Sequence, residues 1–451
     1  MKLFVIGSDV PFQHHGEEGV TAVNIVSYQI LKSLKLMSHD ITLQIIFNRV
    51  HPDGSLSAAE SQELQRLTED GFTVLPPIYA GSYLNKRPVS AIETIGKRLR
   101  ILTCHGRVSD HYPATRVGPL ARERIRASGC DAILTLWSPE GTAATYGFRD
   151  IPKVSYQADP DYHPVEVRLK DHELFSGTTG YLPTADNLSA RVRLILHRWW
   201  LAGFKKAHLR MMRDVDAIAT IAAGNANFYR TQGHPRSIYA RNTWFDPAQN
   251  GTGLGTSNPH SQGDRRTVKI IGHAGNLNAT GTTYGLKFLL VDLLPILEKI
   301  MDGIDYRIHI IGGGQIAPVL QPRLQHPKII VRGFVKNLDS ELRSSDIFLL
   351  LNNAGTYKAA FTRMIMAWSM GLCLIAHGNS HEAIPEVAPA QNVLVGNTPL
   401  EVAQQIRLAA TDPAVNQRIR REGRTTYEKY FAPQIVARTL HEELVRLAGA
   451  G

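Results

Sequence analysis

Cysteines and long apolar runs are scarce in this chain. Its 451 residues include three cysteines, Cys104, Cys130 and Cys373, which lack the spacing of a metal site or a disulfide framework. This scarcity is typical of proteins of the reducing cytoplasm. No segment reaches the about 18 consecutive apolar residues of a membrane span, and the apolar run at 2–7 is short for a signal peptide. We therefore expect a cytoplasmic protein.

Acidic residues are fewer than basic ones. The chain has 40 Asp and Glu against 50 Lys and Arg, a net charge of +10. An excess of positive charge favours anionic partners, such as nucleotide diphosphates, anionic lipid or nucleic acid. No nucleic-acid-binding motif accompanies the charge, so we expect no nucleic-acid partner.

Apolar strand-like runs alternate with amphipathic helical segments in both halves of the chain. A helix is expected at 286–300, and others between the strands. This alternation predicts parallel sheets, which bind ligands at the carboxyl ends of their strands. The fold class is therefore α/β, with two Rossmann-like domains facing across a cleft. The expected strands are 2–7, 40–47, 130–137, 152–159, 216–222, 267–275, 306–314, 328–334, 346–352, 372–378 and 392–396.

The predicted domain boundaries depend on one stretch with little to bury. Residues 250–265 are rich in Gly, Ser, Asn and Thr, a composition typical of linkers. We predict a first domain at 1–245, a linker at 246–266 and a second domain at 267–430. A C-terminal helix is expected at 431–451. It could either stay with the second domain or cross back to the first.

Four segments of the second half follow one another in the order and spacing of a known family. They are 310–315, which contains three glycines, then 329–352, 361–387 and 391–396. Here the chain resembles the retaining glycosyltransferases of family four, which have the GT-B fold. The first half is similar only through short pieces. The resemblance implies transfer of a sugar from a nucleotide-sugar donor in the second domain to an acceptor in the first, without a metal or another cofactor.

The chain departs from the pattern of that family at several positions. The family has two glutamates eight positions apart where this chain has Lys358 and Met366. Asn276 and Tyr284 stand near the place of its basic pair, and Ala158 replaces a histidine of the acceptor domain. A lysine at the sugar position would suit a carboxylated sugar. Loss of both glutamates also leaves open a non-catalytic relative that acts as a binding or partner subunit.

The candidate donor-binding residues come from three loops of the second half. A helix expected to start at 359 would offer backbone N–H groups and its positive dipole end to a diphosphate. Lys358 and Arg363 would add charge, and the glycines would permit close approach of a ligand. An ordinary helix start and an ordinary turn are the alternatives. The set is Gly275, Asn276, Gly312, Gly314, Lys358, Ala360, Phe361, Thr362, Arg363 and Met366.

Two carboxylates are the candidate catalytic residues. Asp159 follows a strand of the first half and is expected near the acceptor hydroxyl, whereas the resemblance implies that Glu386 lies near the donor sugar. The alternatives are a loop-capping aspartate and a helix-capping glutamate. Glu386 and His377 also leave open a sugar-nucleotide epimerase of the same architecture.

The candidate acceptor-binding residues follow the strands of the first half. Because His14 and His15 have no partner at ligand spacing, we predict no metal site. Trp137 would stack on a sugar, although core packing is the alternative. The set is His14, His15, Gly16, Trp137 and Glu140.

One predicted helix, at 191–213, is strongly basic. It carries seven Lys and Arg and no Asp or Glu, with apolar residues such as Leu201 and Phe204 on the other side. A basic amphipathic helix is compatible with peripheral binding to an anionic membrane. A lipid-linked acceptor, as in the biosynthesis of a surface polysaccharide, would follow. The alternative is that its apolar side packs on the first domain.

Overall fold

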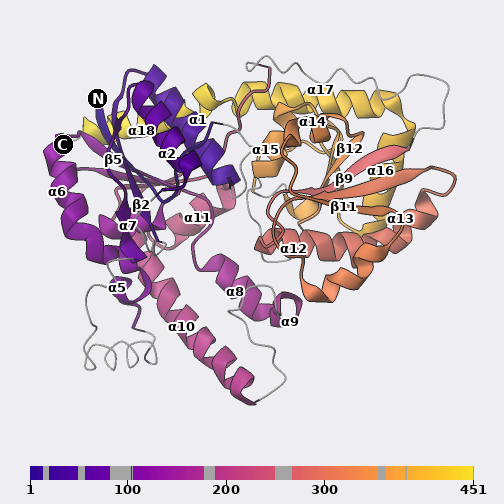
Figure 1. Cartoon of the computed structure of the whole chain (residues 1–451), viewed down its shortest axis with the longest axis horizontal. Coiled ribbons are helices and arrows are strands. Elements are labelled where there is room, and N and C mark those ends of the chain that lie inside the picture. Colours follow the sequence, from indigo (N-terminus) through magenta and orange to yellow (C-terminus); the bar gives the residue numbers. More distant parts are fainter. Residues whose placement is uncertain are drawn as a thin grey trace.

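The protein consists of two α/β domains, each built on a parallel sheet (Figure 1). Both sheets are buried between helices, so their central strands are apolar on both faces. The computed structural model describes residues 1–13, 20–48, 56–81, 103, 105–176, 188–248, 267–352, 362–380 and 383–449.

The first sheet has eight strands in the order β3-β2-β1-β5-β6-β7-β8, with β4 paired to β2. Its centre is β1, where Phe4, Val5 and Ile6 are fully buried. The strands are β1 (Lys2–Gly7), β2 (Asp40–Phe47), β3 (Thr73–Val74), β4 (Ile78–Tyr79), β5 (Ala132–Leu136), β6 (Lys153–Gln157), β7 (Ala217–Thr220) and β8 (Ser237–Tyr239).

Helices cover both faces of this sheet. Gly129 ends α6 in the left-handed conformation (φ 58°), which glycine adopts without strain. The helices are α1 (Ala22–Leu36), α2 (Ala58–Glu69), α5 (Val108–His111), η1 (Pro113–Val117), α6 (Gly118–Ser128), α7 (Pro139–Ala144), α8 (His163–Lys170), α9 (His172–Phe175), α10 (Leu188–Met212) and α11 (Ala223–Thr231).

The second sheet has six strands in the order β11-β10-β9-β12-β13-β14. The chain builds outward from β9 to β11 and then returns to place β12 on the other side of β9. The carboxyl ends of β9 and β12 thus form a topological switch point, where open α/β sheets bind ligands. The strands are β9 (Val268–Ala274), β10 (Tyr306–Ile311), β11 (Ile329–Gly333), β12 (Ile347–Leu350), β13 (Leu374–His377) and β14 (Leu394–Gly396).

The helix expected at 286–300 is part of a longer segment that changes its winding twice. It runs as α12 (Thr280–Lys287), a π-helical stretch η2 (Phe288–Leu293) and α13 (Leu294–Ile300). Pro295 has no N–H for the α-helical bond to Val291, which accounts for a change of winding here. The other helices are η3 (Pro318–Gln325), α14 (Leu338–Arg343), α15 (Thr362–Ser369), η4 (Gly378–Ser380), α16 (Pro399–Thr411), α17 (Pro413–Tyr430) and α18 (Pro433–Ala448).

The end of the chain returns to the first domain. In Figure 1, α17 runs along the second domain and α18 lies beside α1. The guanidinium of Arg236, next to β8, donates to Glu443 of α18 at 2.7 Å, and His39 Nε2 lies 2.7 Å from His441 Nδ1. These contacts make α18 a part of the first domain's core.

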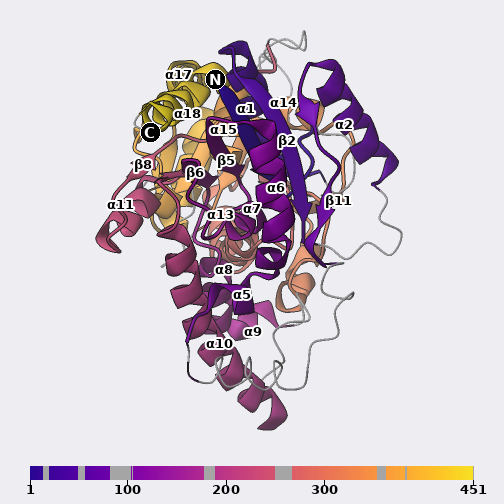
Figure 2. The same cartoon turned by 90° about the vertical axis from the view of Figure 1, so that its left-hand side faces the viewer.

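Helix α10 extends away from the body of the first domain (Figures 1 and 2). In its second half the apolar side packs inward, with Phe204, Ala207 and Met211 buried. In its first half Ile195 and Leu196 are exposed. Within the part of the chain that the structure describes, no helix is both long enough and apolar enough to span a membrane.

Candidate active site

The loops after β9 and β10 lock together through their backbones. Gly275 N–H donates to the Ile311 carbonyl at 3.0 Å, and Leu277 N–H to the Gly313 carbonyl at 3.0 Å. Gly312 has φ 144°, and a Cβ there would lie 1.7 Å from the Gly275 carbonyl oxygen. Glycine is therefore required at position 312, and the two loops form a surface with little side-chain cover.

Asparagine side chains hold the same loops in place. Asn276 Oδ1 accepts from the Asn278 N–H at 2.9 Å, and Asn278 Oδ1 accepts from the Gln315 N–H at 2.9 Å. A Cβ at Gly314 would lie 2.8 Å from Asn278 Nδ2. The side chain of Asn276, a predicted donor-binding residue, thus stabilises the loop itself.

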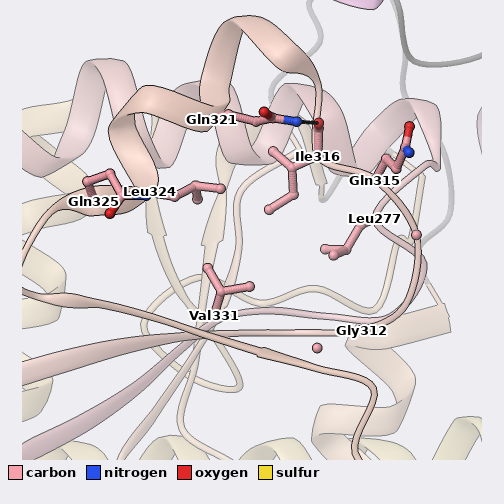
Figure 3. A pocket seen from close by; sticks show the side chains of 10 residues that line it. Leu277, Gly312, Gln315, Ile316, Gln321, Leu324, Gln325 and Val331 are labelled. Carbon is pink, nitrogen blue, oxygen red and sulfur yellow. Dashed lines mark hydrogen bonds between the residues drawn. The ribbon is translucent and has the colours of Figure 1, made fainter.

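A pocket of about 460 Å³ opens beside these loops, between η3 and β11 (Figure 3). Its walls combine apolar and amide side chains on a glycine-rich edge, and Gln321 donates to the Ile316 carbonyl at 3.3 Å. The predicted residues Gly312 and Gly314 lie on its rim. The lining is Leu277, Gly312, Gly314, Gln315, Ile316, Gln321, Leu324, Gln325, Val331 and Gly333.

Three polar side chains meet at the switch point. Arg363 of α15 lies with Nη1 2.5 Å from His273 Nδ1 and donates through Nη2 to Asn352 Oδ1 at 3.3 Å. His273 is the last residue but one of β9 and Asn352 follows β12, so both stand at the carboxyl edge. Burial and then the charge of Arg363 lower the pKa of His273 well below its usual value, and the Gly275 backbone opposes this in part. His273 is therefore neutral at physiological pH.

The start of α15 is tied to the segment that joins the domains. Asn242 Nδ2 donates to Thr362 Oγ1 at 2.7 Å. Thr362, a predicted donor-binding residue, therefore contacts the last segment of the first domain. Met366, which resemblance places at a ribose-binding position, is 3% exposed and packs in the core. The predicted residues Lys358, Ala360 and Phe361 lie outside the described residues.

Glu386 lies between the two domains. Its carboxylate accepts from Arg241 Nε at 2.5 Å and from Tyr239 OH at 2.9 Å, and its side chain is 8% exposed. Both partners belong to the end of the first domain. The structure thus places this carboxylate in an interdomain ion pair, and its role near the donor sugar stays a prediction.

At the first sheet's carboxyl edge, two predicted residues follow β5. Trp137 has a positive φ of 52° and packs edge-on against Tyr156 at 5.8 Å. Glu140 accepts from Ser8 Oγ, and burial, opposed by this hydrogen bond, raises the pKa of the Glu140 carboxyl. Asp159 follows β6 and accepts from Asn225 Nδ2 at 2.9 Å. The predicted residues His14, His15 and Gly16 lie outside the described residues.

A buried hydrogen-bond network leads to Asp161, close to these residues. Tyr112 OH donates to Asp161 Oδ2 at 2.8 Å and lies 2.9 Å from His208 Nδ1. His208 Nε2 lies 2.7 Å from Tyr229 OH. No sequence pattern connects these four residues, because up to 117 positions separate them. The network fixes Asp161 at the carboxyl edge of the first sheet.

Helices α8 and α9, which follow β6, connect the carboxyl edge of the first sheet to the second domain. Arg168 of α8 donates through Nε to Thr280 Oγ1 at 2.8 Å, at the start of α12. Tyr284 of α12 donates to Asp171, and its ring packs on Phe175 of α9 at 5.5 Å. The carboxyl edge of the first sheet is thereby held against α12 of the second domain.

Replacing Glu140 by Gln is expected to remove a pH dependence of stability. Because the folded-state pKa is raised, unfolding releases a proton between the two pKa values, so stability falls as pH rises through that window. Glutamine keeps the contact with Ser8 without titrating. Urea unfolding at several pH values should show Glu140→Gln more stable than the wild type at pH 8, with the difference shrinking toward pH 4. An equal difference at both pH values would contradict this account.

Comparisons with known proteins agree with this geometry. Residues 268–412 match the family model of glycosyl transferases group 1. No curated protein matches the chain. Similar solved structures include sucrose-phosphate synthase from Thermosynechococcus elongatus (11% identity, TM-score 0.60, covering 100% of both chains). A second is a glycosyltransferase from Rickettsia africae (12% identity, TM-score 0.56, covering 100% of this chain and 99% of that one). A third is Anabaena HepE with UDP and glucose (12% identity, TM-score 0.54, covering 99% of both chains).

The fold of this protein is therefore GT-B, two Rossmann-like domains with the carboxyl edges of their sheets held together. Its second domain is of the glycosyl transferase group 1 type. The match of this domain assigns the enzyme class, a glycosyltransferase.

Proposed function

We propose that this glycosyltransferase moves a sugar from a nucleotide-sugar donor to a hydroxyl-bearing acceptor, with retention of anomeric configuration. The observation that carries the proposal is the bare backbone surface of Gly275 and Gly312 at the switch point, beside the guanidinium of Arg363. A glycine-rich edge permits close approach of phosphate, and a guanidinium adds charge. Resemblance to the retaining enzymes of family four supports the stereochemistry.

The pocket beside β11 suits the nucleoside part of the donor. Its apolar walls, Leu277, Ile316 and Val331, would pack on a flat ring, while Gln315 and Gln321 offer amide groups to the ring's edge. Its rim includes Gly312 and Gly314. A nucleotide with its base here would therefore extend its phosphates along the glycine loops.

The first sheet's edge suits the acceptor. Glu140, Asp159 and Asp161 present carboxylates there, which accept hydrogen bonds from hydroxyl groups. A neutral, hydroxyl-rich acceptor fits this edge: a glycan, a lipid-linked sugar or a small molecule. The lipid-linked choice is supported by α10, which exposes Ile195 and Leu196 beside basic residues. On that choice the product is a surface polysaccharide.

The proposed reaction needs neither a protein nucleophile nor a metal. The bond between the anomeric carbon and the donor phosphate oxygen breaks, and the diphosphate leaves with the electron pair. The acceptor oxygen attacks the same face of the sugar, and its proton passes to the departing phosphate oxygen. N–H groups of the glycine loops and Arg363 would stabilise the charge that develops on the diphosphate.

The epimerase alternative is weakened by the bonds that its two residues make. The epimerase depends on Glu386 and His377 as a cleft pair, but Glu386 pairs with Arg241, and His377 Nε2 bonds the Asn397 carbonyl at 3.1 Å. A non-catalytic relative would bind no donor productively.

The function is tested by titrating the protein with UDP, GDP, ADP and dTDP in thermal unfolding, then with the matching nucleotide sugars. At 100 times its dissociation constant, a true ligand adds about 2.7 kcal/mol of stability. No stabilisation by any nucleotide would contradict the proposal.

Asp159→Asn is expected to impair use of the acceptor without affecting the donor. The carboxylate would accept a hydrogen bond from the attacking hydroxyl, whereas an amide turned toward Asn225 holds it poorly. We expect the KM of the acceptor to rise by about tenfold, with the dissociation constant of the nucleotide unchanged. Steady-state kinetics with both substrates varied would measure this. An unchanged acceptor KM would remove Asp159 from the acceptor site.

A further inference from the structure

The chain passes from the first domain to the second after β8 and returns between α17 and α18, and these two crossings lie against each other. Thr243 Oγ1, after β8, donates to the carbonyl of Phe431, between α17 and α18, at 2.6 Å. Tyr427 OH donates to the Trp244 carbonyl at 2.9 Å, and all four residues are buried. Two adjacent crossings define one axis, about which rigid domains can rotate.

Arg168 of α8 contacts the second domain away from this axis. Its Nε donates to Thr280 Oγ1 at 2.8 Å, and its Nη2 donates to the Asn278 carbonyl at 3.4 Å. The side chain of Asn278 in turn accepts from the Gln315 N–H in the loop after β10. In Figure 1, α8 and α9 lie low in the view beside α12, whereas the crossings lie near the top. Arg168 therefore bears on the loop after β9 from the first domain.

Tyr284 of α12 contacts α9 and the residue before it. Its hydroxyl donates to Asp171, and its ring packs edge-on against Phe175 at 5.5 Å. Tyr284 and Phe175 are 8% and 1% exposed. Burial and then the contact with Asp171 raise the pKa of Tyr284, so the hydroxyl keeps its proton at physiological pH. The two domains are thus joined here by side chains alone.

These contacts are few enough to open. One hydrogen bond or one aromatic pair shifts an equilibrium by about two- to tenfold. Three such contacts favour the joined arrangement by about 10- to 1000-fold, which leaves an open state populated at about 0.1–10%. The ion pair of Glu386 with Arg241 stands two positions from Thr243, near the axis, where a rotation moves atoms least. Rotation about the crossings would therefore break the contacts of α8 and α9 first.

We propose that Arg168, Asp171 and Phe175 form a latch between the domains, and that opening of this latch sets the rate at which the spent nucleotide leaves. The nucleotide rests on the proposed function, whereas the latch rests only on the contacts described. Because Arg168 bears on Asn278 and Thr280, a ligand that fixes this loop strengthens the latch. By linkage, the closed latch strengthens binding of that ligand by the same factor.

The test combines small-angle X-ray scattering of the full chain with stopped-flow dissociation of a fluorescent nucleotide. The nucleotide is the one of UDP, GDP, ADP and dTDP that stabilises the protein. Tyr284→Phe removes a hydrogen bond but keeps the ring on Phe175, so the fold is retained. Combined with Arg168→Ala, it should increase the radius of gyration and raise the dissociation rate constant by about ten- to hundredfold. Asp171→Ala should raise that rate by about three- to tenfold, and Asp171→Asn, which keeps an acceptor oxygen, should restore most of the loss.

Two matched variants control for general loosening of the second domain. Tyr306→Phe removes a buried hydroxyl of β10 that has no hydrogen-bond partner among the described residues. Arg407→Ala removes a guanidinium of α16 that donates to the Ile300 carbonyl. Neither should change the radius of gyration or the dissociation rate. If both act like the latch variants, loosening of the domain accounts for the effect and the latch is overturned.

The outcomes separate the latch from the proposed function. Unchanged scattering and dissociation in Tyr284→Phe combined with Arg168→Ala would overturn the latch and keep the function. Expansion without faster dissociation would overturn its role in nucleotide release. If the wild type binds none of the four nucleotides, the proposed function is overturned. Scattering then decides on the latch by itself, since an unexpanded double variant would contradict it.

Discussion

Gly312→Ala is expected to destabilise the second domain by about 2–5 kcal/mol and to abolish measurable nucleotide binding. Gly312 has φ 144°, a conformation that costs an alanine free energy, and a Cβ would lie 1.7 Å from the Gly275 carbonyl oxygen. The two glycine loops would have to move apart. Because those loops form the proposed phosphate surface, stability and affinity should fall together. Chemical unfolding and calorimetric titration with nucleotides measure the two effects.

The neighbouring glycine supplies the control. Gly313 lacks a positive φ, and nothing lies within 4 Å of the position its Cβ would take. Gly313→Ala should therefore change stability by less than about 0.5 kcal/mol. If the two alanine variants behave alike, close contact between the loops is not what requires glycine at position 312.

Loss of the ion pair between Glu386 and Arg241 has the second large effect. The carboxylate is 8% exposed and also accepts from Tyr239, so Glu386→Ala leaves buried donors without a partner. We expect a loss of about 2–3 kcal/mol, less than for a fully buried pair because the Arg241 side chain is 30% exposed. Arg241→Ala should cost a comparable amount, since it leaves the carboxylate buried.

A double-mutant cycle distinguishes an interdomain contact from a catalytic role. If the residues act as a pair, Glu386→Ala combined with Arg241→Ala should cost about 1–2 kcal/mol less than the sum of the single changes. A catalytic carboxylate would instead show a fall in kcat of about a hundredfold or more in Glu386→Gln, at nearly unchanged stability. That second result would support the role predicted from the sequence.

The sequence was most informative where the chain is most regular. Strand β2 spans Asp40–Phe47, as predicted, because its apolar residues recur at every second position, which is the period of a strand. Gly129 ends α6 in a left-handed conformation, which favours glycine and gives such a helix end a visible signal. The GT-B fold follows from many such local signals in a fixed order. The π-helical stretch before Pro295 was not predicted, because the apolar pattern of the expected helix continues through it.

The donor site was only partly visible in the sequence. Gly312 stands in a recognisable glycine loop and Arg363 near a recognisable helix start, but His273 and Asn352 were not in the predicted set. A usable signal existed, because each is a polar residue at the carboxyl end of an apolar strand run. The ion pair of Glu386 was harder to predict, since its partner Arg241 lies 145 positions away in the chain. Pairing between distant residues depends on the fold and leaves no local pattern.

A structure of the protein with bound nucleotide sugar tests the central claim most directly. The account predicts that the diphosphate lies against Gly275 and Gly312, with Arg363 Nη atoms within hydrogen-bond distance of its oxygens and the base in the pocket beside β11. A diphosphate bound away from these loops, or a base outside that pocket, would contradict the proposed donor site.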